Sequence, residues 1–284
     1  MPELPEVETS VRMLKQKVLK KTFVCIWAED SLKGKPLKSL KGKKIEDVER
    51  IGKGMFFHLS DGKFLFTHLK MTGHFLYGEW SLKECPLTKE KAWESQEKIM
   101  QDKKNGYLRF VFLFDNNKQL ALSDPRKFAV VRLMSKKEKE DYAKKMGPDA
   151  LEISKEDFVS LVRSKKKPIK VLLMEQNLIA GVGNIYASEI LFKAGVTPKR
   201  KGDRISVKKA EQIYQVMRDV LQKGVDLKGD SVSDYRLLDG TKGGYQDCHL
   251  VYGRKGEKCL TCSKDIRWCS IGGRGTYYCI SCQK

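Results

Sequence analysis

The chain has 284 residues, of which 40% are hydrophobic and 9% aromatic, and its 56 Lys and Arg against 36 Asp and Glu give a net charge of +20. This length predicts about two domains, and the apolar content excludes a wholly disordered chain. The positive charge favours an anionic polymer as partner, nucleic acid first and an acidic membrane surface second.

The sequence contains no segment that fits a membrane span. The longest stretch without a charged residue is Gln176–Ser188, with 13 residues, whereas a spanning helix needs about 20 mostly apolar residues. Glu3, Glu6 and Glu8 stand where a secretory signal peptide carries basic residues. We therefore expect no membrane partner, and a cytoplasmic or nucleoid-bound protein.

The N-terminal half begins with a predicted helix. Val7, Val11, Leu14 and Val18 recur with helical spacing. Pro5 suits the first turn of such a helix.

Short strand-like runs follow this helix, with hairpin-turn signals at Asp61-Gly62 and Asp115–Asn117. The runs are Thr22–Trp27, Lys44–Ile51, Met55–Leu59, Phe64–Met71, Tyr107–Phe114, Leu120–Leu122 and Phe128–Leu133. Six or seven short strands predict a β-sandwich or barrel. The charged segment Lys83–Lys104 interrupts them, and we expect it to be a mobile insertion.

Helical patterns replace the strands after Gly147–Asp149. Ser154-x-x-Asp157 resembles a capping box at the start of a helix. Further helical patterns cover Ile169–Glu175, Ile185–Lys193 and Val207–Lys223. The glycine-bearing turn Gln176–Asn184 separates the first two. Asp226–Gln246 is rich in Gly, Asp and Ser, which predicts a flexible loop.

Four of the eight cysteines form two Cys-x-x-Cys pairs with 16 residues between the pairs. These cysteines are Cys259, Cys262, Cys279 and Cys282. The spacing is typical of a zinc ribbon, and a reducing compartment argues against disulfides. Four thiolates fill a tetrahedral site, so we expect one structural Zn²⁺. Cys248 and Cys269 lie nearby but belong to no such pair, and we interpret them as bystanders.

Together these patterns predict an α+β multidomain protein. Residues 1–147 would form an N-terminal β-sandwich with a leading helix and carry the catalytic residues. Residues 148–250 would form a helical domain that includes a long loop. Residues 251–284 would form the zinc ribbon.

The N-terminal sequence Met1–Glu6 suggests amine chemistry. Proline at position 2 is small enough that we expect removal of the initiator methionine, which exposes a secondary amine. A neutral amine attacks electrophilic carbon to form a Schiff base, and Glu3 and Glu6 would lie close enough to move protons. An ordinary helix start explains the same residues, because proline and carboxylates are both favourable in a first turn.

Three segments together resemble the bacterial formamidopyrimidine-DNA glycosylases. Pro2–Thr9 is similar to the family's N-terminus, and Asn177–Ala187 is similar to its helix–two-turn–helix. Val251–Arg254 and the four-cysteine ribbon resemble its C-terminus. The resemblance covers nearly the whole chain in the family's order. Leu4 favours this branch over the endonuclease VIII branch, which usually carries Gly there.

The resemblance implies a bifunctional glycosylase and AP lyase of base excision repair that acts on damaged double-stranded DNA. It would excise 8-oxoguanine and formamidopyrimidines after extruding the nucleotide. Pro2 would attack the anomeric carbon, Glu3 would protonate or stabilise the sugar ring oxygen, and Glu6 would support the amine or relay protons. Successive β- and δ-elimination would then nick the strand. We expect a monomer in a bacterial cytoplasm, associated with the nucleoid.

A second catalytic candidate comes from Arg50–Phe57, which resembles the family's basic loop before a β-strand. That loop carries a functional lysine, here Lys53, whose compact charge could contact the damaged nucleotide or its phosphate. A solvated surface lysine is the alternative.

Two further segments, His68–Gly73 and Asp124–Phe128, resemble the family's void-filling loops. By this match Met71 and Arg126 enter the gap left by the extruded base, and Phe128 wedges beside its former partner. Lys127 belongs to the same DNA-binding loop. The alternative is that Met71 and Phe128 are core residues.

Phosphate contacts are expected from three residues, Asn184, Lys170 and Arg274. Asn184 begins a predicted helix, where backbone N–H groups and the dipole favour anions. Lys170 aligns with a family lysine, and Arg274 lies at the tip of the ribbon hairpin. The ribbon carries seven Lys and Arg against two acids. The loop Arg236–Gln246 would close over the flipped base.

Other functions remain open at this stage. An endonuclease VIII-like enzyme would keep the chemistry and act on oxidised pyrimidines. A catalytically inactive zinc-ribbon protein would bind damaged DNA only. A basic ribosomal or nucleoid protein explains the charge but not the N-terminus or the paired loops.

Overall fold

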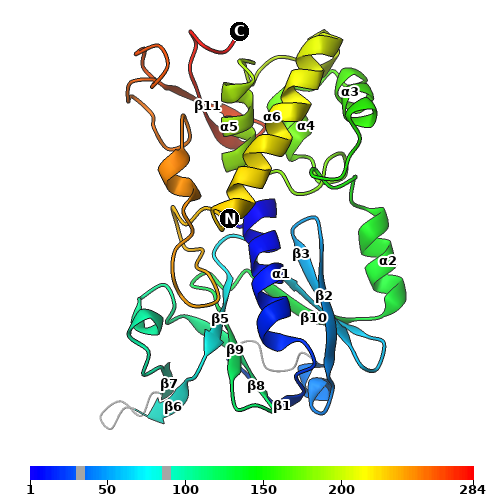
Figure 1. Ribbon diagram of the computed structural model, residues 1–284, viewed down its shortest axis with the longest axis vertical. Helices are drawn as coiled ribbons and strands as arrows, with labels where there is room; N and C mark the ends of the chain where they lie inside the picture. Colours follow the sequence, from blue (N-terminus) through cyan, green and yellow to red (C-terminus); the bar gives the residue numbers. More distant parts are fainter. Residues whose placement is uncertain (30–35, 85–90) are drawn as a thin grey trace. The chain divides into compact units, whose positions relative to one another are not determined.

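The computed structural model describes residues 1–29, 36–84 and 91–284 and is shown in Figure 1. The chain divides into two compact units. The N-terminal unit contains Met1–Pro2, Glu6–Tyr142 and Lys228–Gly244, and the second unit contains Glu3–Pro5, Ala143–Leu227 and Tyr245–Lys284. This division differs from the predicted domains because the loop 228–244 belongs to the N-terminal unit and the ribbon belongs to the same unit as the helices.

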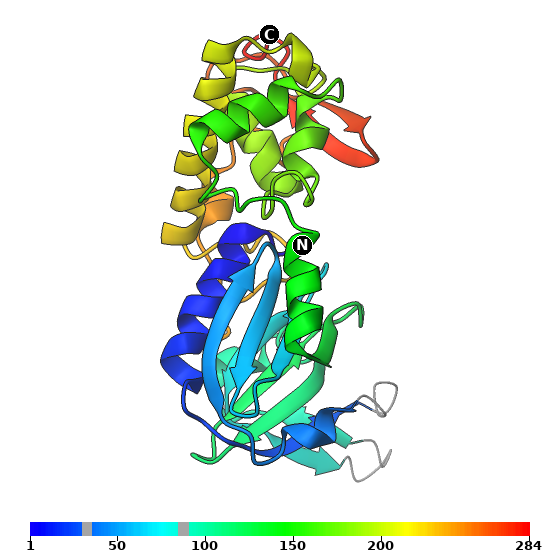
Figure 2. The same cartoon turned by 90° about the vertical axis from the view of Figure 1, so that its right-hand side faces the viewer.

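The N-terminal unit contains two four-stranded antiparallel sheets, ordered β1-β8-β9-β5 and β10-β4-β3-β2. The strands of the first sheet are β1 (Phe23–Ala28), β5 (His74–Gly78), β8 (Leu108–Phe114) and β9 (Gln119–Ser123). Those of the second are β2 (Ile45–Ile51), β3 (Gly54–Leu59), β4 (Phe64–His68) and β10 (Val130–Met134). Helix α1 (Leu4–Val18) lies beside the second sheet in Figure 2.

Both sheets contribute to one apolar core, which confirms the predicted sandwich. Phe23 and Phe112 from the first sheet are fully or almost fully buried in the same cluster as Phe57 and Leu65 from the second. The predicted helical stripe of α1 joins this cluster with Val7, Val11, Leu14 and Val18. Burying one such side chain contributes roughly 1.5–3 kcal/mol. The inner faces of the two sheets and the apolar stripe of α1 therefore cover one another.

The described part of the segment 83–104 has regular structure, unlike the mobile insertion that we expected. β6 (Ser81–Glu84) pairs with β7 (Lys91–Glu94), and a 3-10 helix, η3 (Lys98–Gln101), follows. Residues 85–90 lie outside the described residues. A second 3-10 helix, η2 (Pro36–Leu40), lies between β1 and β2.

The second unit is helical, as predicted. It contains α3 (Lys155–Arg163), α4 (Ile169–Met174), α5 (Asn184–Lys193) and α6 (Val207–Asp226), with short 3-10 helices η4 (Gly202–Arg204) and η5 (Tyr245–Cys248). Ser154 caps α3 at the position expected, because its hydroxyl accepts a hydrogen bond from the Asp157 N–H at 3.0 Å. The ribbon hairpin pairs β11 (Arg267–Ile271) with β12 (Arg274–Tyr278).

Helix α2 (Lys136–Lys144) is an element that the sequence did not predict. It belongs mostly to the N-terminal unit, where Tyr142 packs against Phe56 and Phe66. Across the described residues, every helix is too short or too polar to cross a membrane.

Candidate functional site

The carboxylate of Glu3 is bound to the first turn of α5. Its two oxygens accept hydrogen bonds from the backbone N–H groups of Ile185 at 2.9 Å and Tyr186 at 3.3 Å. The unpaired N–H groups and the dipole of a helix N-terminus stabilise an anion at this place. The chain is held there also by its backbone, because the Leu4 N–H donates to the Gly181 carbonyl at 3.0 Å.

The glycine-bearing turn before α5 makes room for these first residues. A Cβ atom on Gly183 would lie 2.3 Å from Cδ of Glu3, and one on Gly181 would lie 2.5 Å from a methyl carbon of Leu4. No side chain fits at such distances. The turn that resembles a helix–two-turn–helix is therefore shaped around Glu3 and Leu4.

The binding of Glu3 by α5 bears on the predicted phosphate contact at Asn184. The N–H groups that were expected to bind phosphate at the start of α5 bind Glu3 instead. The Asn184 side chain donates from Nδ2 to the Gly275 carbonyl at 3.1 Å, which connects α5 to the ribbon hairpin. Contact of its side chain with DNA stays a prediction.

Lys170 is also placed differently from the prediction. It is completely buried, and its ammonium donates to the Ser188 hydroxyl at 2.8 Å. Burial lowers the pKa of Lys170 to about 8, and the charge of Glu3 partly opposes this change. A side chain enclosed in this way has no surface with which to touch a phosphate. The predicted phosphate contact is therefore corrected to a buried cation between α4 and α5, the helix whose first turn binds Glu3.

Glu6 lies in the N-terminal unit and holds the start of the loop 228–244. Its Oε1 accepts a hydrogen bond from the Asp230 N–H at 2.8 Å. Its backbone carbonyl accepts another from the Tyr235 hydroxyl at 3.0 Å, and burial raises the pKa of Tyr235. A Cβ on Gly229 would lie 2.9 Å from Cγ of Glu6. The sequence placed Glu6 in the site, but gave no sign of its partners more than 220 positions away.

Lys53 lies in the tight turn that joins β2 to β3 and is buried. Arg50 fixes this turn, since its guanidinium donates to Glu8 at 2.9 Å and to the Gly52 carbonyl at 3.1 Å. The charge of Lys53 acts on His68, whose pKa is lowered to about 4 by burial and by Lys70 and Lys53. The burial contradicts the alternative of a solvated surface lysine.

Gly54, next to Lys53, makes a further close contact. A Cβ there would lie 2.8 Å from both the Phe66 ring and the Tyr142 hydroxyl. The small residue therefore allows α2 to pack against the strand that begins beside Lys53.

The two predicted void-filling loops present exposed apolar side chains. Met71 is 41% exposed and Phe128 is 50% exposed, which excludes the alternative that they are core residues. The guanidinium of Arg126 lies 4.7 Å from the centre of the Phe128 ring. Lys127 is paired with Glu29 at 2.7 Å. Three of the four residues predicted to contact DNA from these loops, Arg126, Lys127 and Phe128, therefore lie in one of them.

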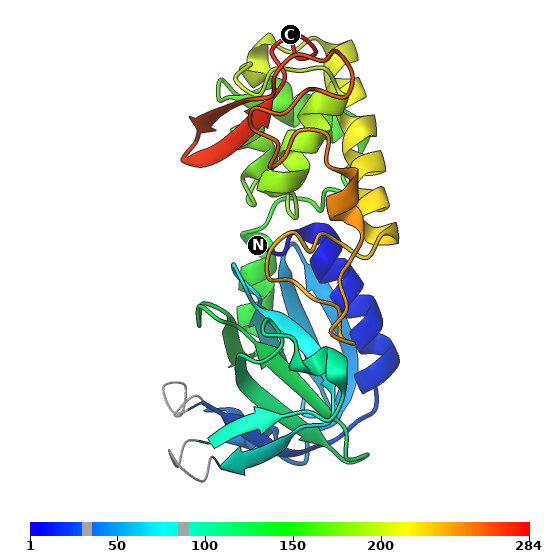
Figure 3. The same ribbon diagram turned by 90° about the vertical axis from the view of Figure 1, so that its left-hand side faces the viewer.

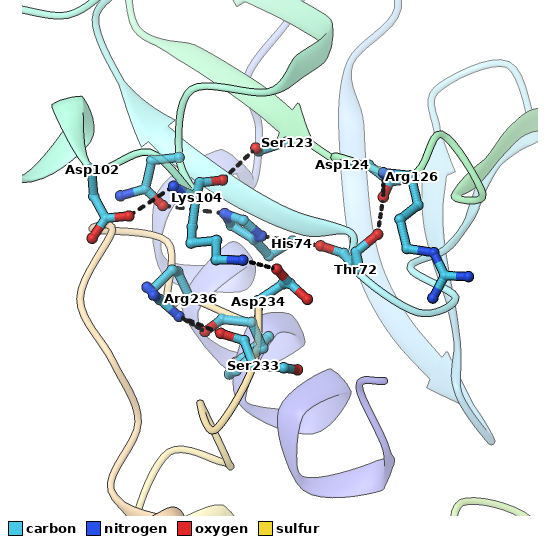
Figure 4. Close-up of polar contacts among 12 residues, drawn as sticks. Thr72, His74, Asp102, Lys104, Ser123, Asp124, Arg126, Ser233, Asp234 and Arg236 are labelled. Carbon is cyan, nitrogen blue, oxygen red and sulfur yellow. Dashed lines mark hydrogen bonds and ion pairs between the residues drawn. The ribbon is translucent and has the colours of Figure 1, made fainter.

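Asp124 joins the two loops. It is buried, and it accepts hydrogen bonds from the Thr72 hydroxyl, from the Arg126 N–H at 3.3 Å and from the Ala129 N–H at 2.7 Å. Figure 4 shows Thr72 and Asp124 facing each other across the two loops. One carboxylate thus fixes the backbone on both sides of Arg126 and next to Met71. The sequence singled out these loops but not the residue that holds them together.

The four ribbon cysteines lie close enough to share one metal ion. Their sulfur atoms are all within 4.8 Å of one another, with Cys259 and Cys282 at 3.8 Å and Cys262 and Cys279 at 3.4 Å. A zinc–sulfur distance of about 2.3 Å places thiolates about 3.8 Å apart in a tetrahedron. The residues therefore fit a metal centre of the predicted kind. Among the described residues, neither Cys248 nor Cys269 belongs to this group.

The ribbon is anchored to α5 by a buried carboxylate. Glu189 accepts hydrogen bonds from the N–H groups of Leu250, Val251 and Tyr252 at 2.8–3.0 Å. Arg274 is exposed at the end of the hairpin, where the prediction placed it. Figure 3 shows the hairpin extending from the helices of the second unit.

Comparison with known proteins gives matches over both units. A sequence model of the formamidopyrimidine-DNA glycosylase N-terminal domain matches residues 1–131, and one of the corresponding H2TH domain matches residues 146–236. The formamidopyrimidine-DNA glycosylase of Thermus thermophilus is 34% identical over all of this chain and 98% of its own length. That of Solibacter usitatus is 35% identical over the full length of both chains.

Solved structures agree with the sequence matches. The crystal structure of the MutM (Fpg) protein from Thermus thermophilus has a TM-score of 0.82 and 32% identity, covering 99% of this chain and 98% of that chain. The complex of Lactococcus lactis Fpg with DNA containing Fapy-dG has a TM-score of 0.81 and 30% identity, with 99% and 100% coverage. A complex of the same protein with DNA containing an abasic site is equally similar, at a TM-score of 0.81.

Proposed function

Because the chain belongs to the formamidopyrimidine-DNA glycosylase family of DNA repair enzymes, we propose that it excises 8-oxoguanine and formamidopyrimidines from double-stranded DNA and then nicks the strand. The observation that carries the proposal is the placement of two carboxylates close to Pro2 in sequence. Glu3 is held by the first turn of α5, and Glu6 is held by Asp230. Carboxylates that are fixed in position near an amine can transfer the protons that base excision and strand nicking require.

Removal of Met1 would make Pro2 the N-terminal secondary amine. The lone pair of its nitrogen forms a bond to C1′ of the damaged nucleoside, and the bond from C1′ to the base breaks. The Glu3 carboxylate takes the proton that the Pro2 nitrogen loses on bonding and delivers it to the sugar ring oxygen as the ring opens, which leaves an iminium ion between Pro2 and C1′. Glu6 relays protons to and from the amine.

The iminium ion makes the neighbouring C2′ hydrogen acidic. Loss of that proton expels the 3′ phosphate by β-elimination, and loss of the C4′ proton then expels the 5′ phosphate by δ-elimination. Water hydrolyses the remaining Schiff base and releases the enzyme. In both eliminations the electron pair of the broken C–O bond leaves with the phosphate, whereas in the ring opening it stays on the sugar oxygen that Glu3 protonates.

Lys53 is proposed to contact the damaged nucleotide or its phosphate. The neutral state of His68, whose pKa is lowered to about 4, leaves Lys53 and Lys70 as the cations of this group. Met71 and Arg126 would fill the gap left by the extruded base, with Phe128 stacked beside the estranged partner. Their exposure makes this insertion possible without unfolding.

Asn184 and Arg274 are proposed as phosphate contacts, and the ribbon is proposed to bind one Zn²⁺. When bound, the ion would cross-link the two Cys-x-x-Cys turns, since four thiolates leave no open position for catalysis. We propose that the protein acts as a monomer on DNA in the bacterial cytoplasm, in association with the nucleoid.

Borohydride trapping tests the proposed chemistry. A duplex with one 8-oxoguanine opposite cytosine is incubated with wild type and with Pro2→Gly, beside a duplex that carries an oxidised pyrimidine. Wild type should give a covalent complex that maps to the N-terminal residue, because borohydride reduces the iminium ion to a stable amine. Intact-protein mass spectrometry checks that Met1 has been removed.

Two outcomes contradict the proposal in different ways. Trapping on the oxidised pyrimidine alone would keep the amine mechanism and assign an endonuclease VIII-like substrate. Binding of damaged DNA without trapping on either lesion would leave a catalytically inactive damaged-DNA-binding protein.

A further inference from the structure

The segment 95–106 contacts the loop 228–244 within the N-terminal unit through one fully buried amide. Asn105 donates from Nδ2 to the Gly240 carbonyl at 3.3 Å and to the Ile99 carbonyl at 2.9 Å. Its Oδ1 accepts from His74 Nε2 at 3.2 Å. The Asn105 side chain is fully buried, and its bonds to Gly240 and His74 are made in a buried environment, where an unmade hydrogen bond is costly. Asn105 therefore joins three separate parts of the chain.

The contact at Gly240 is tight. Gly240 has a φ of +82°, and a Cβ there would lie 2.9 Å from Nδ2 of Asn105 and 3.2 Å from the sulfur of Met100. The loop can approach this closely only because position 240 has no side chain. The loop 228–244 therefore packs closely against the segment 95–106 at a position that requires glycine.

Two further bonds hold the same loop. The Tyr77 N–H of β5 donates to the Leu238 carbonyl at 2.7 Å. Lys104, the neighbour of Asn105, pairs with Asp234 at 2.5 Å, as Figure 4 shows. At its beginning the loop is bound to Glu6 through Asp230. The loop 228–244, which contains most of the segment Arg236–Gln246 expected to close over the extruded base, is therefore fixed at one end by Glu6 and farther along by Asn105, Tyr77 and Lys104.

His74 connects this anchor to the void-filling loops. The ring is completely buried, and burial lowers the pKa of His74 to about 4, so the imidazole is neutral near pH 7. A neutral ring donates from one nitrogen, and the shorter contact, to Asn105, identifies Nε2 as the donor. Nδ1 faces the Thr72 carbonyl at 3.5 Å, and Thr72 is the residue bound to Asp124.

We propose that Asn105 is a positioning residue for base excision, which holds the loop 228–244 in register with the two void-filling loops. This inference rests on the proposed glycosylase activity. The loop would act on the extruded base, so excision of a damaged base should need Asn105. An abasic site has no base to cover, and nicking there should proceed without it.

The test compares two reactions of the same protein. In Asn105→Ala, the single-turnover rate of 8-oxoguanine excision should fall about tenfold, the equivalent of one buried hydrogen bond. Nicking of a duplex with a preformed abasic site should change by less than about twofold. Asn116→Ala is the matched control, because Asn116 is an exposed asparagine whose Nδ2 donates to Tyr77 at 3.2 Å, and both rates should be unchanged.

A second readout does not depend on the enzyme's substrate. Amide hydrogen exchange in peptides from 230–244 should be faster in Asn105→Ala than in wild type, while exchange in the ribbon stays the same. Asp234→Asn provides a milder variant, since it removes only the ion pair with Lys104 at a half-buried position. The rate of 8-oxoguanine excision should also fall in Asp234→Asn, and the apolar core of the N-terminal unit should stay folded.

The outcomes separate the inference from the proposed function. Unchanged exchange in 230–244, or equal losses of excision and abasic-site nicking, would overturn the positioning role. Wild type that nicks abasic sites but removes no oxidised purine would instead overturn the proposed substrate, and the exchange result would still decide whether Asn105 holds the loop.

Discussion

Gly183 lies so close to Glu3 that a Cβ atom at position 183 would stand 2.3 Å from the carboxylate carbon. The same carboxylate accepts the N–H groups of Ile185 and Tyr186, which begin α5. Glu3 and the turn before α5, about 180 positions later in the sequence, are therefore in direct contact. The turn specifies where the carboxylate can be.

Gly183→Ala should displace Glu3 from α5 while leaving the fold in place. A displacement of about 1 Å in a reacting group can reduce a rate about 100-fold, so we expect a loss of that order in 8-oxoguanine excision. Single-turnover kinetics measures it, and far-UV circular dichroism checks the fold. Ser160→Ala changes an exposed side chain on α3, and this control should keep wild-type activity. Full activity in Gly183→Ala would show that the position of Glu3 is unimportant.

Local patterns predicted much of the secondary structure. The stripe from Val7 to Val18 gave α1, and the capping box at Ser154 gave the start of α3. These features depend on residues a few positions apart, so the sequence displays them directly. The cysteine spacing predicted the metal-ligating group for the same reason.

Long-range polar contacts could not be predicted in this way. Glu6 is bound to Asp230, Asp124 to Thr72, and Asn105 to Gly240. A buried polar side chain needs a partner, but its identity depends on which strands and loops meet in space. Lys170 is the clearest example, because a lysine is usually exposed and this one is enclosed against Ser188.

The resemblance to a known family identified the candidate residues but not their surroundings. It singled out Met71, Arg126 and Phe128, and their loops are fixed by Asp124, a residue of the matching segment to which the resemblance gave no role. Strand β5 was also missed, because the predicted run Phe64–Met71 ends at His68 and a new strand starts at His74. Its partner, β9, lies 45 positions further along the chain.

The buried ammonium of Lys170 should make stability depend on pH in the alkaline range. Its pKa is lowered from 10.5 to about 8 in the folded protein. Between these values the unfolded chain binds more protons than the folded one, so stability rises as the pH increases. Below about pH 8 Lys170 is charged in the folded protein, and the free energy of unfolding is reduced by the full cost of burying its ammonium. The difference between the two pKa values corresponds to about 3 kcal/mol.

Comparison with Lys170→Met isolates this effect. Urea unfolding at pH 7.5 and pH 10 should show wild type gaining up to about 3 kcal/mol relative to Lys170→Met over this interval. Lys193→Met, at the exposed last position of the neighbouring helix α5, is the control and should follow wild type. A constant difference between wild type and Lys170→Met at both pH values would mean that Lys170 is not a buried ammonium.

Loss of one ribbon thiolate should abolish DNA binding and leave the N-terminal unit folded. Cys259 is buried in a small cluster with Phe192, Val251 and Ile266, and this cluster is too small to fold without a cross-link. The binding energy of a structural zinc is folding energy, about 10–16 kcal/mol in small zinc modules. Cys259→Ser should therefore unfold the ribbon and remove Arg274 from its position on the hairpin.

The matched control for this variant is Cys269→Ser, which changes a half-exposed cysteine on β11 that lies outside the metal-ligating group. Electrophoretic mobility shift on an abasic-site duplex should show binding by Cys269→Ser and an affinity at least 100-fold weaker for Cys259→Ser, and metal analysis should find the bound ion only in the former. Since the two sheets share no residue with the ribbon cluster, hydrogen exchange in β8 and β9 should be alike in both variants. Equal DNA affinity of the two variants would remove the ribbon from DNA binding, whereas loss of exchange protection in both units would show that the ribbon also stabilises the sandwich.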